Sequence, residues 1–418
     1  MKTSIVTALL LLFFIHQLSA QRACVSFTYQ QKEISKDPSL QQKMNAIEDF
    51  TLQKINNSGS QYLRTGESAV ITIPVVVHIL YHRPDQHLTD AQVFSQIAAL
   101  NRDFRRMAAD TINTPARFKS LAADCQIEFK LAISDPRKRN TTGIVRKYTP
   151  VQEWDADDKV KFSAEMGDDA WDSKSYLNIW VCNLNDVAGY SSILGGPAEK
   201  DGIVLGFNVF GTINTMTGYG MGKTAVHEVG HWLSLRHLWG DIDCGDDGVS
   251  DTPRQSIYTV GCPSGIRISC GNTPDGNMYM DYMDFTDDVC MNMFSLGQKA
   301  RMRALFAPGG VRNSLLSSTG LNPPLIFESP VPEEDPKWLH PQLFPNPAST
   351  EITIDLSYDI RWIGKVITLF NQQGQIVQQF PVTSRLQKID ITKLKPGMYF
   401  LVAKKEDGES IRQKLIKF

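Results

Sequence analysis

The sequence lacks an excess of charge of either sign: 43 lysines and arginines face 45 aspartates and glutamates, for a formal net charge of −2. Without a broad basic field, the chain lacks the electrostatic attraction on which binding to nucleic acid depends. Beyond its first twenty residues it also lacks any apolar run of the roughly 20 residues that a membrane-spanning helix needs. We therefore expect a protein that neither binds nucleic acid nor spans a bilayer.

The first twenty residues are the one strongly apolar stretch. Lys2 precedes an apolar run from Ile5 to Ile15, and the small residues Ser19 and Ala20 follow it. This order is typical of a signal peptide over residues 1–20, and the run is shorter than a membrane anchor requires. Export to an oxidising compartment would permit disulfides among the seven cysteines.

The composition changes several times along the 418 residues, which leave room for two or three folded units. We expect a polar prosegment over 21–55, with its end falling between 55 and 68 and a weak helix near 40–52. A large domain over 56–320 follows, then a proline-rich linker over 321–338 and a small all-β domain over 339–418.

Strand and helix patterns alternate within 56–320, which indicates an α/β domain. Strands are expected at 70–82, 126–133, 176–184 and 202–210. Helices are expected after Thr89, which should cap the first of them, and at 159–171, 224–233 and 296–306. His78 and His82 fall in the first strand, and we interpret them as strand residues rather than as metal ligands.

The segment HEVGHWLSLRH carries the chemistry. His227 and His231 are four residues apart, so both imidazoles lie on one face of a helix and can share one cation. Glu228 follows the first histidine, where its carboxylate can take a proton from water that attacks a carbonyl. The spacing therefore predicts a zinc site with Glu228 as general base.

A catalytic zinc needs a third protein ligand. No glutamate occurs between Glu228 and Glu328, which excludes the downstream glutamate that some zinc peptidases use. His237 stands six residues after His231, and the arrangement resembles the metzincin pattern HExxHxxGxxH. The glycine of that pattern falls on Ser234, where a positive φ would cost a serine about 1 kcal/mol.

The resemblance extends to the pappalysin family of metzincins, through IPVVVHILYH, LNRDF, YLNIWVCNL, HEVGHWLSLRHLWG, VSDTP and NMYMDYMDF. It implies an α/β domain with a mixed, twisted sheet, an active-site helix and an irregular C-terminal subdomain. It also implies an edge strand that binds substrate near 188–192, and a Met-turn with Met283 beneath the zinc. A tyrosine of related enzymes that helps bind the oxyanion is replaced by Phe285, so Tyr282 is the alternative.

The same resemblance implies disulfides Cys244–Cys270 and Cys262–Cys290, although the sequence alone allows three pairings of these four cysteines. Cys125 and Cys182 lie in apolar strands and are interpreted as buried thiols, with a third disulfide as the alternative. The acidic segment DIDCGDDGVSDTP is similar to a calcium site of the family, with the ligands Asp247, Val249, Asp251 and Thr252. A solvated acidic loop is the alternative interpretation.

The last eighty residues resemble the C-terminal sorting domain of type IX secretion, through LFPNPAS, GQIV, LKPGMYFLV and KLIKF. The KLIK ending is similar to that of the KLIKK group of secreted proteases, and a ligand-binding β-sandwich is the alternative. We expect secretion or cell-surface display through the periplasm of a Gram-negative bacterium. Cys24, just after the signal, could bind the zinc in a latent form.

Together these features predict a secreted, monomeric zinc endopeptidase that is made as a latent precursor and acts on extended peptides or proteins. The resemblance implies cleavage before arginine, for which Asp287 and Asp288 are the candidate carboxylates and Asp288 is the first choice. The alternative is that both are surface or calcium-associated acids. Two alternatives are an inactive binding protein with the metzincin fold and a zinc aminopeptidase. The expected partners are peptide substrates and the type IX secretion machinery.

Overall fold

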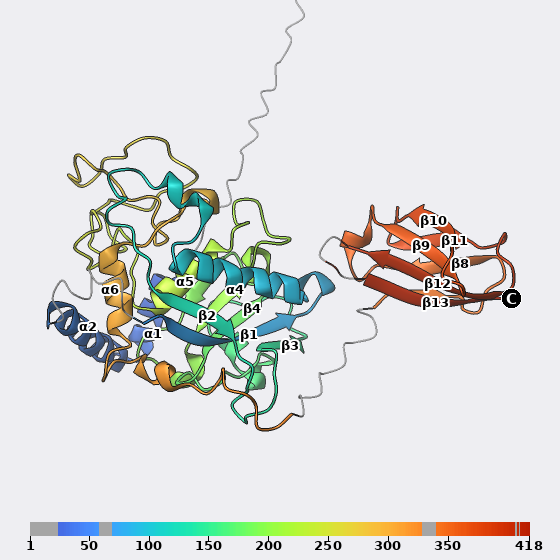
Figure 1. Ribbon diagram of the computed structural model, residues 1–418, viewed down its shortest axis with the longest axis horizontal. Coiled ribbons are helices and arrows are strands. Elements are labelled where there is room, and N and C mark those ends of the chain that lie inside the picture. Colours follow the sequence, from blue (N-terminus) through green and yellow to red (C-terminus); the bar gives the residue numbers. More distant parts are fainter. Residues whose placement is uncertain (1–23, 58–68, 328–339, 406–407, 409) are drawn as a thin grey trace, which may run out of the picture.

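The computed structural model describes residues 24–57, 69–327 and 340–418, except 406, 407 and 409 (Figure 1). The expected signal peptide lies outside these residues, as do the segment in which we expect the prosegment to end and most of the expected linker. Among the residues described, no helix combines the length and apolar character needed to cross a bilayer. They form a larger α/β unit and a smaller all-β unit, which confirms the expected fold class.

The centre of the larger unit is a six-stranded sheet with the order β2-β1-β4-β6-β5, in which β3 also pairs with β1. Only β5 and β6 are antiparallel; the other pairs are parallel. β5 therefore forms an antiparallel edge within the predicted stretch 188–192. The strands are β1 (Ile71–Tyr81), β2 (Ile127–Leu131), β3 (Ile144–Tyr148), β4 (Leu177–Cys182), β5 (Gly189–Ser191) and β6 (Ile203–Gly206).

Helix α4 (Asp90–Phe104) begins at the predicted cap. The Thr89 hydroxyl accepts from the Gln92 amide, and the Gln92 side chain accepts from the Thr89 amide, so two amides at the helix start are satisfied. The apolar face of α4 joins α5 (Lys223–Trp232) in the main core, against the sheet. α6 (Leu296–Ala304) completes this core, and it also begins at a capping box.

Two helices precede the sheet in the chain. α1 (Ser26–Lys36) contacts the edge strand β5, and α2 (Ser39–Asn57) packs beside α6 (Figure 1). The sequence predicted only part of α2 and did not predict α1. Neither helix has a continuous apolar face, because α2 buries only Leu40 and Thr51 and α1 only Ser26, Tyr29 and Glu33.

The helix expected at 159–171 is wrong. The chain forms only two short 3₁₀ turns there, at Lys159–Lys161 and Ser163–Glu165. Asp158 and Met166 have positive φ values of 70° and 66°, which an α-helix cannot contain. The strand expected at 202–210 is shorter than predicted, because a 3₁₀ turn follows Gly206.

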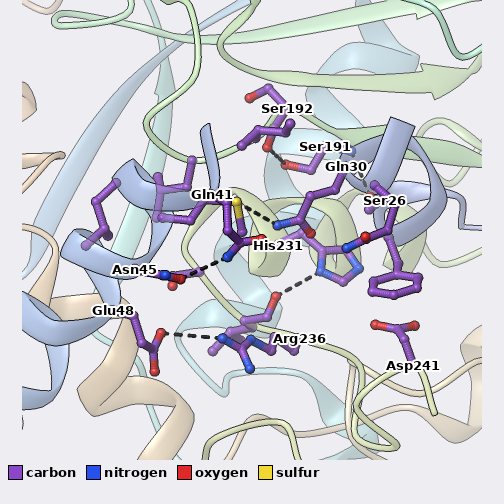
Figure 2. A pocket seen from close by; sticks show the side chains of 18 of the residues that line it. Ser26, Gln30, Gln41, Asn45, Glu48, Ser191, Ser192, His231, Arg236 and Asp241 are labelled. Atoms are coloured by element: carbon purple, nitrogen blue, oxygen red, sulfur yellow. Dashed lines mark hydrogen bonds and ion pairs between the residues drawn. The ribbon is translucent and has the colours of Figure 1, made fainter. Parts of the chain in front are cut away.

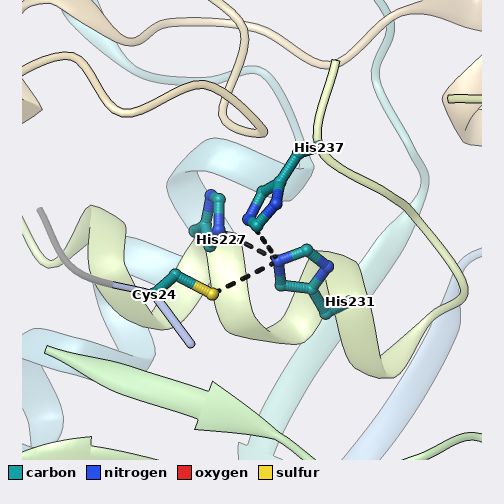
Figure 3. A group of neighbouring side chains, drawn as sticks. All are labelled: Cys24, His227, His231 and His237. Atoms are coloured by element: carbon teal, nitrogen blue, oxygen red, sulfur yellow. Dashed lines mark hydrogen bonds between the residues drawn. The ribbon is translucent and has the colours of Figure 1, made fainter. Parts of the chain in front are cut away.

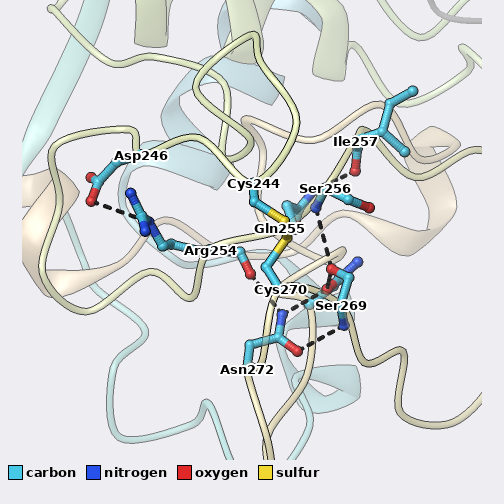
Figure 4. The surroundings of a disulfide bond; sticks show 10 residues. Cys244, Asp246, Arg254, Gln255, Ser256, Ile257, Ser269, Cys270 and Asn272 are labelled. Atoms are coloured by element: carbon cyan, nitrogen blue, oxygen red, sulfur yellow. Dashed lines mark hydrogen bonds and ion pairs between the residues drawn. A yellow bond between two sulfur atoms is a disulfide. The ribbon is translucent and has the colours of Figure 1, made fainter.

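The long segment between α5 and α6 contains no α-helix and is cross-linked by two disulfides, Cys244–Cys270 and Cys262–Cys290. Around the first of them, side chains rather than a ladder satisfy the backbone (Figure 4). The Asn272 amide donates to the Arg254 carbonyl, and the Ser269 hydroxyl accepts from the Ser256 amide. The pairing is the one that the family resemblance implies.

The smaller unit consists of two antiparallel sheets with the orders β10-β9-β12-β13 and β11-β8-β7. They enclose a core of their own around Trp362, Ile354 and Leu401. The strands are β7 (Gln342–Phe344), β8 (Glu351–Asp355), β9 (Val366–Asn371), β10 (Ile376–Pro381), β11 (Leu386–Asp390), β12 (Gly397–Lys404) and β13 (Ser410–Lys417).

Candidate metal centre

Three imidazoles meet at the end of helix α5. His227 and His231 lie one turn apart on the helix, and His237 comes from the chain beyond it (Figure 3). The Nε2 atom of His231 is 3.0 Å from that of His227 and 3.1 Å from that of His237. His227 and His237 are almost fully buried. Four ligand atoms, including Cys24 Sγ, lie close enough together to hold one ion.

Ser234 makes the turn that brings His237 back. Its φ is 73°, the left-handed conformation expected where the family pattern has glycine. The Leu235 amide donates to the Gly230 carbonyl and the Ser234 amide to the His231 carbonyl, both over 2.9 Å. These two bonds form a Schellman motif, which ends α5 and reverses the chain within one turn.

The second nitrogen of each ring fixes its tautomer. The Nδ1 atoms donate to the carbonyls of Tyr282 (2.6 Å) and Leu235 (2.9 Å) and to the Asp241 carboxylate (2.5 Å). A carbonyl oxygen only accepts, so the rings of His227 and His231 carry their protons on Nδ1, and their Nε2 lone pairs face each other. Burial lowers the pKa of His231 well below its usual value, which keeps this ring neutral.

Such converging lone pairs repel unless a cation lies between them. Zinc–imidazole bonds of about 2.0–2.1 Å in a tetrahedral arrangement place neighbouring nitrogens roughly 3.3 Å apart. The observed separations of 3.0 and 3.1 Å are close to that value. The residues present therefore fit a zinc ion, and the three Nδ1 acceptors orient the ligands as in known zinc sites.

Glu228 is buried beside the histidines, and one of its carboxylate oxygens already has a partner. The Ser26 hydroxyl donates to Glu228 Oε2 over 2.9 Å and accepts from the Ser191 amide over 2.9 Å. Ser26 therefore connects the candidate general base to the edge strand β5. In this arrangement a residue of the expected prosegment occupies the place beside Glu228 that a substrate would need.

Cys24 lies on the open side of the three imidazoles. Its Sγ is 3.5 Å from His231 Nε2, and its backbone forms a parallel bridge with Gly189 in β5. Burial and the nearby charge of Glu228 raise the pKa of this thiol well above its usual value. A bound dication would act in the opposite direction, because coordination stabilises the thiolate.

Met283 packs directly beneath the helix that carries the histidines. It is fully buried, and a Cβ added to Gly230 would come within 2.5 Å of its sulfur. Glycine at position 230 therefore permits the close contact. Phe285 lies 4.9 Å, centroid to centroid, from the His237 ring. Tyr282 contributes its carbonyl to His227, while its own ring lies under Lys223 Nζ.

Asp287 and Asp288 lie beside the first turn of α5. Asp288 is buried, and one of its oxygens accepts from the amides of Met221 (2.8 Å) and Lys223 (3.3 Å). It thus stabilises the start of the helix. Asp287 is partly exposed and faces Gly218, whose Cβ would be 3.9 Å from Asp287 Oδ1. Of the two, Asp287 is the more accessible carboxylate.

The candidate calcium residues lie together in one loop. Asp247 Oδ1 accepts from the Thr252 hydroxyl and the Val249 amide, while its buried Oδ2 has no hydrogen-bond partner among the described residues. Burial raises the pKa of Asp247 to about 7. Asp251 is engaged differently: its carboxylate accepts from Ser295 and Gly297 at the start of α6.

The remaining histidines and cysteines have structural positions. His78 is buried in β1, and its Nδ1 lies 2.6 Å from Asp168 Oδ2, far from the three imidazoles in the sheet. Cys125 and Cys182 are buried thiols and form no disulfide. Sequence reasoning missed Asp241, Ser26 and Tyr258, whose ring packs on Phe285 and Trp239. Of these three residues, only Asp241 has a sequence signal, because it is a carboxylate four residues after a predicted ligand, His237.

Comparisons with known proteins agree with this geometry. Residues 161–307 match the peptidase family described as pregnancy-associated plasma protein-A, and residues 342–417 match the secretion system C-terminal sorting domain. An extracellular metalloprotease of Pyricularia oryzae is 46% identical over 94 residues, which are 22% of this chain and 33% of that relative. The chain therefore aligns with about a third of the length of that relative.

Two solved structures match over nearly their whole length. Mature mirolysin of Tannerella forsythia in complex with a cleaved peptide is 47% identical, with a TM-score of 0.59, and the match covers 60% of this chain and 96% of that one. A promirolysin mutant of the same organism is 42% identical, with a TM-score of 0.64, and the match covers 71% and 97%. The matched share of this chain thus rises when the precursor replaces the mature form.

Proposed function

We propose that this chain, which belongs to the pregnancy-associated plasma protein-A family of metalloproteases, the pappalysins, is a latent endopeptidase. Loss of residues near its N-terminus would activate it. It is a zinc metalloprotease with a C-terminal sorting domain for secretion or cell-surface display.

The observation that carries the proposal is the convergence of three Nε2 lone pairs at 3.0–3.1 Å, each imidazole held by an acceptor at Nδ1. We assign His227, His231 and His237 as the zinc ligands. When bound, zinc supplies Lewis-acid polarisation of the scissile carbonyl and acidifies water. The open side of the ligand set, where Cys24 lies, leaves space for substrate once the prosegment departs.

The chain's own groups then perform the proton transfers. Glu228 accepts a proton from the attacking water and gives it to the leaving amine, a role that requires an acceptor oxygen beside the ligands. β5 is the edge strand of the sheet, and Gly189–Ser191, which residues 24–26 contact in the precursor, would pair with an extended peptide once those residues depart. Met283 supports α5 from below and keeps the ligand geometry rigid.

Latency follows from the same contacts. In the precursor, Cys24 faces the three histidines and the Ser26 hydroxyl donates to the Glu228 carboxylate. Both the open side of the metal site and the proposed general base are therefore blocked. The prosegment also uses the edge strand, because Val25 donates to the Gly189 carbonyl. Support comes from the comparisons, since a precursor structure matches 71% of this chain and a mature one 60%.

The preference for arginine after the scissile bond rests on Asp287 and Asp288. A guanidinium fork pairs best with a carboxylate in a partly desolvated pocket. Asp287 is partly exposed, so its carboxylate would contact the arginine of the substrate. Asp288 is hydrogen-bonded to the start of α5, so it would position the backbone that forms the pocket. A substitution of Asp288 must therefore be checked for folding.

Calcium is proposed at the loop of Asp247, Val249, Asp251 and Thr252. The supporting observation is the buried Asp247 Oδ2, which has no hydrogen-bond partner among the described residues, in a loop rich in oxygen atoms. Asp251 would contribute less directly, because both of its oxygens already accept from the start of α6. A cation there would tie the disulfide-linked segment to α6.

The test of the proposed function compares Glu228→Gln with the natural enzyme after activation. The variant should bind one zinc per chain by elemental analysis but cleave internally quenched peptides at least about 10³-fold more slowly, since the base is lost. Hydrolysis of aminoacyl substrates in preference to internal bonds would identify an aminopeptidase. Zinc binding without any cleavage by the natural enzyme would favour an inactive binding protein.

A further inference from the structure

The carboxylate of Glu48, on helix α2, is held by two arginines of the catalytic unit. Arg301 forms a two-pronged ion pair with it, in which Nη1 donates to Oε1 over 2.9 Å and Nη2 contacts Oε2. Arg236 approaches the same Oε2 to 3.8 Å. The Arg301 side chain is 1% exposed, whereas Glu48 and Arg236 lie closer to solvent. The two arginines thus form a binding site for a carboxylate, and Glu48 occupies it.

This site opens into a cavity that also reaches the metal ligands. The cavity has a volume of about 270 Å³, and Arg301 is among its lining residues. Figure 2 shows His231, Ser192 and Arg236 around it. Helices α1 and α2 form its other side, and loss of residues near the N-terminus would remove that side. A groove would then lead from the ligands to Arg301, along the end of the edge strand β5.

The position of Arg301 relates the site to the scissile bond. Its Nε donates to the Ser234 carbonyl over 3.1 Å, beside the last turn of α5, whereas Asp287 and Asp288 lie beside the first turn. The two candidate subsites are therefore at opposite ends of the active-site helix. If the arginine after the scissile bond binds beside Asp287, the residues before the scissile bond extend toward Arg301.

We propose that in the mature enzyme Arg301, assisted by Arg236, binds an acidic side chain of the substrate on the N-terminal side of the scissile bond. This inference rests on the proposed endopeptidase function and adds a second specificity element to it. Glu48 would be the internal mimic of that substrate carboxylate, and its removal would uncover the site together with the metal.

The physical reason is the charge that Arg301 keeps once α2 no longer covers it. The guanidinium stays charged at every physiological pH, and without Glu48 the acceptor that it keeps on the catalytic unit is the Ser234 carbonyl. Its Nη1 and Nη2 atoms, which Glu48 engages in the precursor, can then donate two parallel hydrogen bonds to another carboxylate. The backbone of Gly248 restricts the space, because a Cβ there would lie 3.4 Å from Arg301 Nη1.

The first experiment uses the activated natural enzyme and pairs of quenched peptides with a central arginine. The two peptides of a pair differ at one position before the scissile bond, where one has glutamate and the other glutamine, and there is one pair for each such position. One position should show a kcat/KM at least about tenfold higher for glutamate. Cleavage of all peptides with equal kcat/KM would overturn the acidic subsite and leave the endopeptidase function standing; no cleavage of any peptide would refute the function itself.

Variants locate the subsite. Arg301→Lys keeps the charge but loses the fork, and Arg236→Gln removes the outer charge, so each should reduce the glutamate-to-glutamine ratio, the former toward one. Arg254→Gln removes an exposed arginine outside the cavity and is the matched control, which should retain the full ratio. A ratio that survives both Arg236→Gln and a folded Arg301→Lys would disprove the assignment.

A second measurement tests Glu48 in a peptide taken from the precursor, added to the mature enzyme with a quenched peptide as substrate. A synthetic peptide of residues 24–57 should inhibit the mature enzyme, and Glu48→Gln in that peptide should raise its Ki at least about tenfold. Asp49→Asn makes the same charge change at the next, exposed residue and should leave the Ki within about twofold. Equal inhibition constants for the two variants would refute the role of Glu48.

Discussion

Ser234 lies in the left-handed region with φ = 73°, although serine pays a steric penalty there that glycine avoids. Replacing it by glycine should relieve about 1–2 kcal/mol of strain. The gain is offset by about 0.4–1 kcal/mol, because glycine has more conformational freedom in the unfolded chain. No hydrogen bond of the Ser234 hydroxyl is recorded among the described contacts, so a net stabilisation of about 0.5–1 kcal/mol is expected.

The assay is thermal unfolding of the activated enzyme carrying Glu228→Gln, which prevents self-digestion. For a unit of this size, the melting temperature should rise by roughly 1–4 °C. Ser256→Gly is the matched control at a position outside the left-handed region, and it should lower the stability by about 0.5–1 kcal/mol. Because the Schellman turn positions His237, zinc affinity should not fall in Ser234→Gly. A lower melting temperature for Ser234→Gly than for the parent would refute the strain argument.

Three further predictions concern activation, calcium and export. Cys24→Ala should shorten the lag before the precursor becomes active by about tenfold, measured with a quenched peptide; an unchanged lag would assign latency to Ser26 and the helices instead. Chelation of calcium should lower the melting temperature of the mature enzyme by several degrees, and Asp247→Asn should abolish that response, whereas Asp243→Asn, an exposed acid nearby, should retain it. Truncation after Pro336 should leave an active protease that accumulates inside the outer membrane, and its appearance in the medium at the normal level would contradict the sorting role of the C-terminal unit.

The local pattern predicted the parts of the fold that depend on few residues. Strand β1 is a run of β-branched residues buried on both faces, and Thr89 with Gln92 forms a complete capping box. The histidine spacing likewise depends only on the pitch of α5. These features follow from periodicity, which the sequence displays directly.

The failures came from contacts between distant segments. The polar stretch 159–171 has a helical pattern, but the fully buried Lys161 donates to the Lys200 carbonyl, and Asp158 accepts from the Tyr29 hydroxyl. Contacts with distant segments therefore replaced the local helix. β5 is only three residues long and contains a glycine, which gives no periodic signal. Ser26 and Arg301 act through partners far along the chain, Glu228 and Glu48, and no motif marks them. Asp241 lies only four residues after its partner His237, but a lone carboxylate at that spacing is a weak signal.

The weak periodicity of α1 and α2 has its own physical meaning. On our proposal these helices leave the enzyme on activation, and a segment with a large buried apolar face would remain bound after cleavage. Their apolar contacts are few, chiefly those of Tyr29 and Leu40. Their polar anchors are Ser26 with Glu228, Tyr29 with Asp158, Glu33 with Lys200 and Glu48 with Arg301. Each is strong only while the covalent link keeps its effective concentration high. If the chain is cut as proposed, water and substrate compete for every partner, among them the proposed general base Glu228 and the arginines of the proposed substrate groove.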